Sequence, residues 1–144
     1  MTAPLNLHLN RYFDAAPEQV FDAWLTRDWG LWLPPAGAIC EVVQIDPRPG
    51  GQYRVRMTMS DGRQVDIGGT YQVIDRPRRL SLTWLGSYSD HETVIELSFR
   101  AEGDGTMMTL RQTGFPDPAA REGFERGWSG PTGSFDKLEA HLRR

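Results

Sequence analysis

The chain has 144 residues, of which 39% are hydrophobic and 24% charged, so it has the size and composition of one folded domain over residues 1–144. Its formal net charge is −3, with 16 Lys and Arg scattered among 19 Asp and Glu, and this excludes the basic stripe that a nucleic-acid partner requires. No run approaches the roughly 18 apolar residues that span a bilayer, so we expect no membrane insertion. The single cysteine, Cys40, agrees with a reducing compartment, and we expect a cytoplasmic protein.

The first part of the chain predicts one strand followed by two short helices. Apolar and polar residues alternate over residues 5–13, which is the period-two pattern of a half-buried strand. Pro17 suits a first helical turn, and the apolar residues of 20–25 recur at helical spacing. Another helical turn over 28–33 ends before Pro34, because a proline disfavours helical geometry in the residue before it.

The middle of the chain predicts an antiparallel meander. Six further strands are expected, at residues 39–46, 53–59, 64–74, 80–85, 93–100 and 107–113. Turn-forming residues separate them, among them Pro49-Gly50-Gly51 and Asp61-Gly62. Short hairpins therefore join strands that are neighbours in the sequence.

The last segment predicts a helix that covers the apolar face of this sheet. Asp117 and Pro118 are suited to the N-cap and first turn. An apolar stripe at helical spacing follows, made of Phe124, Trp128, Phe135, Leu138 and Leu142. Pro131 removes a backbone hydrogen bond, so we expect a kink or a delayed helix start there. The expected class is α+β, with a helix-grip architecture in the order β-α-α-β6-α and a curved antiparallel sheet around a long C-terminal helix.

Several motifs, in the right order along nearly the whole chain, resemble the START-like superfamily, also called SRPBCC. The subfamily they resemble is homologous to the C-terminal domain of the heat-shock protein 90 ATPase activator. The motifs are Pro17-Glu18-Gln19-Val20-Phe21-Asp22-Ala23-Trp24, Trp32 followed by Pro34, Asp46-Pro47-Arg48-Pro49-Gly50-Gly51, Gly68-Gly69-Thr70-Tyr71 and Gly127-Trp128-Ser129. The chain departs from the family pattern at Gln112, where the family often has a histidine or another polar residue, and at Pro131. A stand-alone bacterial-type relative is the closer comparison.

The resemblance implies an apolar cavity between the sheet and the last helix. This fold places Trp32, Trp84 and Trp128 at the cavity wall, so we expect these three residues to contact a ligand. Inward strand parity and the helical stripe add a second set of candidates, namely Tyr53, Val55, Met57, Tyr71, Ile95, Phe99, Met108 and Phe135.

Three functions remain open on these grounds. The aromatic and Met-rich inner face favours a non-catalytic domain that binds a small hydrophobic or amphipathic ligand. The family name implies a stress-related co-chaperone that activates the ATPase of a chaperone partner through its surface. Superfamily relatives imply an enzyme, a cyclase or hydrolase of aromatic or polyketide-like substrates.

The sequence offers little support for catalysis or cofactor binding. His91 and Glu92 are neighbours in an extended segment, so their side chains point to opposite faces and form no acid–base pair. Three dispersed histidines have no metal-ligand spacing, and we expect no catalytic residue, no metal and no cofactor. A monomer or a weak homodimer is expected.

Overall fold

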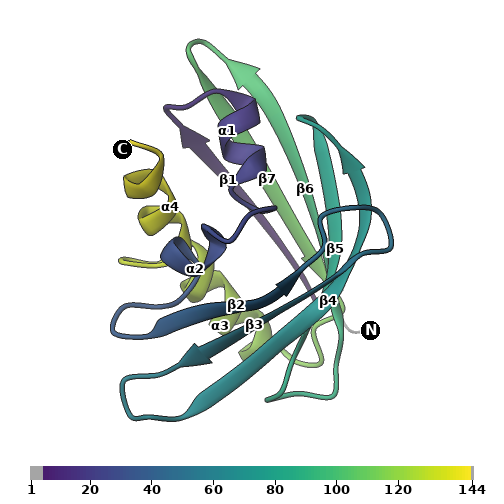
Figure 1. Cartoon of the computed structure of the whole chain (residues 1–144), viewed down its shortest axis with the longest axis vertical. Coiled ribbons are helices and arrows are strands. Elements are labelled where there is room, and N and C mark those ends of the chain that lie inside the picture. The colour runs from purple at the N-terminus through teal and green to yellow at the C-terminus, as the bar shows by residue number, and fades with distance from the viewer. Residues whose placement is uncertain (1–4, 144) are drawn as a thin grey trace.

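The computed structural model describes residues 5–143, in which a curved antiparallel sheet wraps around the helices (Figure 1). The strands are β1 (Asn6–Phe13), β2 (Ile39–Ile45), β3 (Gln52–Thr58), β4 (Gln64–Asp75), β5 (Arg79–Gly86), β6 (Thr93–Glu102) and β7 (Gly105–Thr113). Their order across the sheet is β1-β7-β6-β5-β4-β3-β2, with every neighbouring pair antiparallel. The expected meander from β2 to β7 is therefore confirmed, and β1 closes the sheet beside β7.

The sheet bends where its strand register shifts. One irregularity lies between Val42 and Gln44, and another lies between Tyr71 and Val73. Such bulges kink a strand and increase its twist. Gly69 allows the close approach of β4 and β5, since a Cβ there would lie 1.9 Å from the Thr83 carbonyl oxygen.

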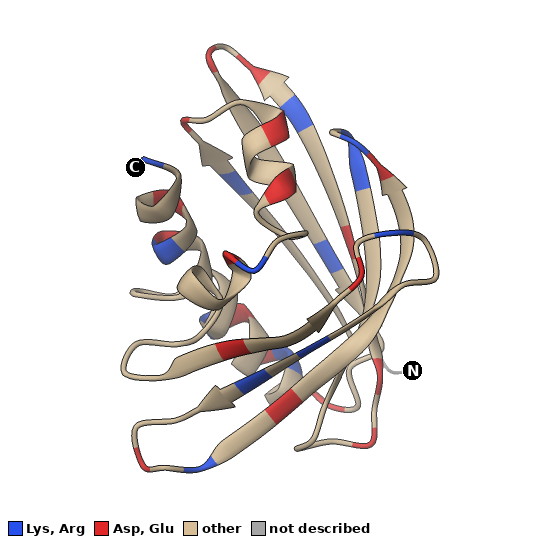
Figure 2. Cartoon of the chain, viewed as in Figure 1, with Lys and Arg blue, Asp and Glu red and all other residues tan. Residues whose placement is uncertain are grey.

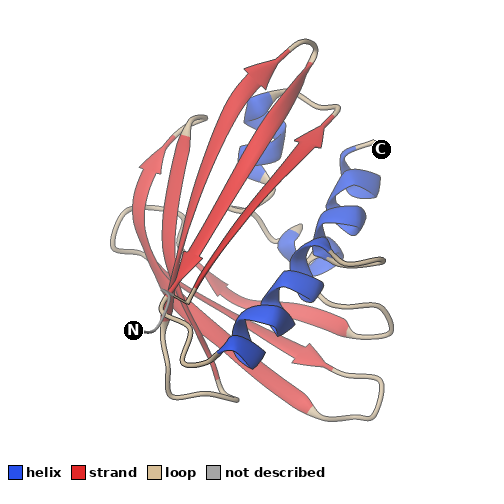
Figure 3. Cartoon of the chain, turned by 180° about the vertical axis from the view of Figure 1, so that it is seen from behind, coloured by secondary structure: helices blue, strands red, loops and turns tan. Residues whose placement is uncertain are grey.

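Four helical segments lie on the concave side of the sheet (Figures 1 and 3). They are α1 (Pro17–Asp22), α2 (Trp29–Trp32), α3 (Pro118–Ser129) and α4 (Ser134–Leu142). The first helix was expected to extend to residue 25. It ends three residues earlier, at Asp22, and the chain continues as turns. Asp117 is the predicted N-cap of α3, and its carboxylate accepts a hydrogen bond of 2.8 Å from the Ala120 N–H.

The predicted interruption of the C-terminal helix at Pro131 is confirmed. The helix divides into α3 and α4, separated by residues 130–133. Within this break Thr132 has a φ of 57°, a left-handed conformation that is unusual for a β-branched residue. The helix-grip architecture is thus present, with a broken rather than continuous helix inside the sheet.

A single apolar cluster fills most of the space between the sheet and the helices. The aromatic rings of its centre interlock, and Trp24 lies 4.9 Å from Trp32 and 5.6 Å from Trp128 between ring centroids. At the β1 edge of the sheet, Arg11 forms ion pairs with Asp136 and Glu139, which tie α4 to this edge.

Charged residues of both signs are interspersed over the strands and helices (Figure 2). Among residues 5–143, no helix combines the length and the apolar character that crossing a bilayer demands.

Candidate functional site

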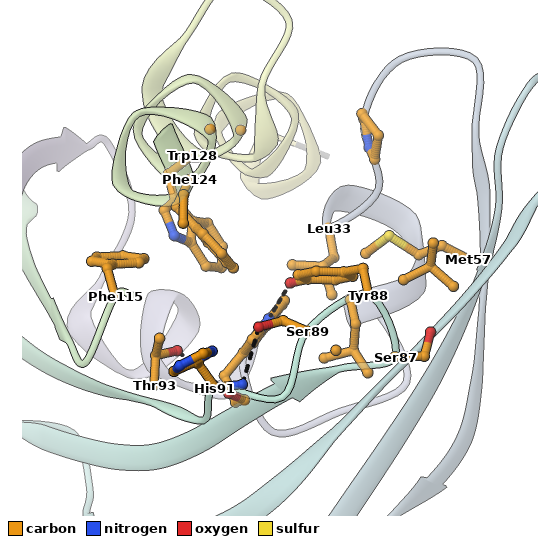
Figure 4. Close-up of a pocket in the computed structure, with 18 of the residues that line it drawn as sticks. Leu33, Met57, Ser87, Tyr88, Ser89, His91, Thr93, Phe115, Phe124 and Trp128 are labelled. Carbon is orange, nitrogen blue, oxygen red and sulfur yellow. Dashed lines mark hydrogen bonds between the residues drawn. The ribbon is translucent and has the colours of Figure 1, made fainter. Parts of the chain in front are cut away.

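A cavity of about 790 Å³ lies between one end of the sheet and α3. Its walls come from β3, β4, β5, the loop between β5 and β6, and the segment that leads into α3 (Figure 4). The residues that line it include Met57, Arg63, Trp84, Ser87, Tyr88, Ser89, His91, Thr93, Phe115, Asp117, Ala120, Gly123, Phe124, Gly127 and Trp128. Several of the loop residues among them are exposed, so the cavity opens to solvent on that side.

Small residues on one face of α3 keep this space free. Ala120, Gly123 and Gly127 all line the cavity, at spacings that place them on one side of the helix. A Cβ built on Gly123 or Gly127 would meet no atom within 4 Å. The two glycines therefore leave space for another molecule, although glycine weakens a helix by about 1 kcal/mol relative to alanine.

Aromatic rings from β5, from α3 and from the segment before α3 form an apolar part of the wall. Trp84 and Trp128 meet edge to face with their ring centroids 5.6 Å apart. Phe124 extends this wall, 6.1 Å from Trp84 and 5.4 Å from Phe115. Aromatic faces and edges held in this way suit a flat or apolar ligand.

A buried polar network supports the same wall from behind. The Trp128 indole donates to Gln112 Oε1 at 3.0 Å, and Gln112 Nε2 donates to Thr93 Oγ1 at 2.9 Å. Thr93 Oγ1 lies 3.4 Å from the Trp84 carbonyl oxygen. All the side chains of this network are buried, so the hydrogen bonds fix the orientation of the Trp128 ring.

The loop between β5 and β6 carries Tyr88 to the mouth of the cavity. A Cβ on Gly86 would lie 2.0 Å from the Tyr88 ring, so the ring packs directly against this glycine. The Trp84 indole N–H donates to the Tyr88 hydroxyl at 3.2 Å (Figure 4). Partial burial raises the pKa of Tyr88 above its usual value, and the hydroxyl stays protonated at neutral pH.

The structure places three of the eleven predicted ligand contacts on the cavity wall: Met57, Trp84 and Trp128. The other eight are buried in the core and do not line the cavity, namely Trp32, Tyr53, Val55, Tyr71, Ile95, Phe99, Met108 and Phe135. Their predicted inward orientation agrees with this burial. They lie where other side chains fill the interior; for example, Trp32 packs against Trp24, and Phe135 stacks on Trp128.

Several lining residues were not predicted. Tyr88 and His91 belong to the connection between β5 and β6, where the sequence predicted no ligand contact. The His91 N–H does bond the Ser89 hydroxyl within this turn. Two signals were present in the sequence: an aromatic residue between two serines, and glycines four residues apart within a helix. Across residues 5–143, no three His, Cys, Asp or Glu side chains come close enough together to hold a metal ion.

The fold and the cavity define a helix-grip protein of the START-like class. The model of the family described as "Activator of Hsp90 ATPase homolog 1-like protein" matches residues 14–143, and the chain belongs to this family. Membership supports a ligand-binding or activator-type domain. No curated protein matches the chain significantly.

Solved bacterial structures share the fold over nearly the whole chain. A protein from Chromobacterium violaceum is 26% identical, with a TM-score of 0.90 and coverage of 99% of both chains. A protein from Rhodobacter sphaeroides is 25% identical, with a TM-score of 0.81 and coverage of 96% of this chain and 91% of that one. The fold also matches an AHSA1 protein from Silicibacter pomeroyi at 24% identity, with a TM-score of 0.79 and coverage of 96% of this chain and 97% of that one.

Proposed function

We propose that the chain is a non-catalytic binding domain that holds one small apolar or amphipathic molecule in the cavity beside α3. The observation that carries this proposal is the open space next to Gly123 and Gly127, in a cavity that Trp84 and Trp128 also line. Gly123 is partly buried and Gly127 is exposed, so this space is open to solvent, and a ligand that removes the apolar wall beside it from water gains free energy.

The size and lining of the cavity also support a ligand. Its volume of about 790 Å³ lies within the range of roughly 300–1,000 Å³ usual for small-molecule sites. Its inner wall is aromatic and sulfur-containing, and its polar groups gather at the solvent side. This division suits a molecule with an apolar body and a polar end.

The proposal is tested by filling the cavity from α3. In the variant Gly123→Leu, an apolar side chain occupies the space. Leucine also has a higher helix propensity than glycine, so the substitution favours α3. Ala119→Leu is the matched control, since Ala119 is exposed on α3 and does not line the cavity. Binding of the neutral fluorescent probe N-phenyl-1-naphthylamine should weaken at least about tenfold in the first variant and remain unchanged in the second.

Two results would contradict the proposal. The first is that the wild-type protein binds no probe and also carries no small molecule in native mass spectrometry after gentle purification. The other is equal probe affinity in wild type and Gly123→Leu. If Gly123→Leu fails to fold, Gly127→Met tests the same space from the next turn of α3.

The name of the family favours a second candidate, a co-chaperone that raises the ATPase rate of a chaperone. In that case the exposed surface acts and the cavity is dispensable. Wild type and Gly123→Leu would then stimulate a purified Hsp90-type ATPase equally. An unchanged ATPase rate without a detectable complex would remove this candidate.

A further inference from the structure

We propose that the ligand carries hydrogen-bond acceptor oxygens at its polar end and that the hydroxyls of Ser87, Tyr88 and Ser89 bind them. This inference rests on the proposed function, since it concerns the molecule held in the same cavity. It adds the chemical class of that molecule: an apolar body that ends in a carbonyl or a carboxylate.

The first observation is that each of these three hydroxyl oxygens already accepts a hydrogen bond from an N–H group. Ser87 Oγ accepts from the Asp66 backbone at 3.0 Å. Tyr88 Oη accepts from the Trp84 indole at 3.2 Å, and Ser89 Oγ accepts from the His91 backbone at 3.0 Å. In all three bonds the N–H is the donor and the hydroxyl is the acceptor.

The second observation concerns the protons of these three hydroxyl groups. Amide and indole N–H groups only donate, so none of these bonds uses the proton of the hydroxyl. Within residues 5–143, no side-chain or backbone acceptor takes any of the three protons. Ser87, Tyr88 and Ser89 all line the cavity, so the loop presents three O–H donors at its mouth (Figure 4).

The charged lining residues agree with an acceptor-bearing ligand. Arg63 lines the same mouth, and its guanidinium has no ion-pair or hydrogen-bond partner in the described part of the chain. Asp117, the carboxylate that also lines the cavity, accepts a hydrogen bond from the Ala120 N–H through Oδ1. The Tyr88 phenol is protonated at neutral pH because the ordinary pKa of tyrosine is about 10, so this donor persists under ordinary conditions.

The three free O–H donors influence which ligands the cavity binds. A ligand whose buried end has no acceptor would displace water from these hydroxyl protons and leave them unpaired. A carbonyl or carboxylate oxygen at the same place would replace the displaced water. The loop therefore favours an oxygen acceptor over an apolar group at the ligand's polar end.

The test uses four probes that share an anthracene body and differ at one position. The probes are 2-acetylanthracene, anthracene-2-carboxylate, 2-ethylanthracene and 2-(aminomethyl)anthracene, and binding is followed by energy transfer from tryptophan. The ketone and the carboxylate should bind about tenfold more tightly than the ethyl compound, as one retained hydrogen bond implies. The ammonium compound should bind more weakly than the ketone, because it cannot accept the hydroxyl protons. The ratio between ketone and carboxylate separates neutral from anionic ligands.

Variants of the loop assign the selectivity to its hydroxyls. Tyr88→Phe and the double variant Ser87→Ala/Ser89→Ala should each reduce the preference for the ketone over the ethyl compound several-fold, with little change for the ethyl compound itself. Tyr12→Phe is the control, because Tyr12 lies on β1 and does not line the cavity. Thermal unfolding verifies that each variant is folded.

The outcomes separate this inference from the proposed function. Equal affinity for all four probes, or a preference for the ketone that both loop variants retain, would overturn the inference and leave the binding domain intact. A failure of every probe to bind would overturn both.

Discussion

Trp128 donates its indole N–H to Gln112 Oε1 at 3.0 Å and thereby joins α3 to β7 behind the cavity. Gln112 is fully buried, and its amide nitrogen bonds Thr93 on the neighbouring strand. One side chain therefore satisfies polar groups on a helix and on a second strand. The orientation of the aromatic wall depends on this link.

Removing the link should destabilise the fold. In Gln112→Leu the apolar volume is nearly kept, but the Trp128 N–H is left buried without a partner, so we expect a loss of about 2 kcal/mol in the free energy of unfolding. Urea denaturation followed by tryptophan fluorescence measures it. The control Gln44→Leu, at an exposed position of β2, should change stability by no more than about 0.5 kcal/mol. An equal effect of the two substitutions would contradict the structural role of Gln112.

The glycines of α3 should be replaceable by alanine at a gain in stability. Gly123→Ala and Gly127→Ala should each raise the free energy of unfolding by about 0.5–1 kcal/mol, because a Cβ meets no atom and alanine favours the helix. Gly105→Ala is the contrasting variant, since its Cβ would lie 2.4 Å from the Phe13 carbonyl oxygen. It should destabilise the protein in the same thermal or urea assay. Destabilisation by the α3 variants would show that the space beside them is filled.

The Cys40 thiol should react slowly at neutral pH. Burial raises its pKa to about 11, and the weaker influence of Lys137, which lowers the pKa, does not offset this. Because the thiolate is the nucleophile and a raised pKa reduces its population, alkylation by iodoacetamide should accelerate about tenfold per pH unit from pH 8 towards pH 11. Lys137→Met should slow the reaction further. Protein unfolded in urea should react as an ordinary thiol, and a rate that levels off near pH 9 in folded protein would contradict the raised pKa.

Thr132 should be a site of strain within the helix break. Its φ of 57° is unfavourable for a β-branched residue and well tolerated by asparagine. Thr132→Asn should therefore raise the free energy of unfolding by about 1 kcal/mol, while its backbone N–H still donates to Asp136 Oδ2. The same change at Thr113, at the exposed end of β7, should lower stability because asparagine is unfavourable in strands. A loss of stability at both positions would argue against strain at Thr132.

Local patterns were sufficient to predict the secondary structure. Every predicted strand agrees with the structure within two residues at each end. Alternating polarity defines a strand, and turn residues such as Pro49-Gly50-Gly51 end it, so both signals are local in the chain. The break at Pro131 was predictable for the same reason. The first helix was predicted too long, since its apolar spacing continues through Trp24 and Leu25 while the backbone already turns.

The candidate site was less predictable. Strand parity correctly indicated that residues such as Tyr71, Ile95 and Phe99 face inward, and all of them are buried. Parity does not reveal whether the space in front of an inward side chain is occupied. Phe21, for instance, lies 5.2 Å from Phe99 between ring centroids and fills that part of the interior.

By itself, the sequence determined which faces are apolar, the bounds of each strand to within two residues, and where the last helix is interrupted. Only the tertiary structure decided where the interior stays open, because the cavity depends on how Gly123, Gly127 and Trp128 of α3 are placed relative to Trp84 of β5. It also decided that the hydroxyls of residues 87–89 line the opening. The hydrogen bond from Asp66 to Ser87 joins residues that are distant in the sequence, so only the tertiary structure reveals it, whereas the bonds from Trp84 to Tyr88 and from His91 to Ser89 are local.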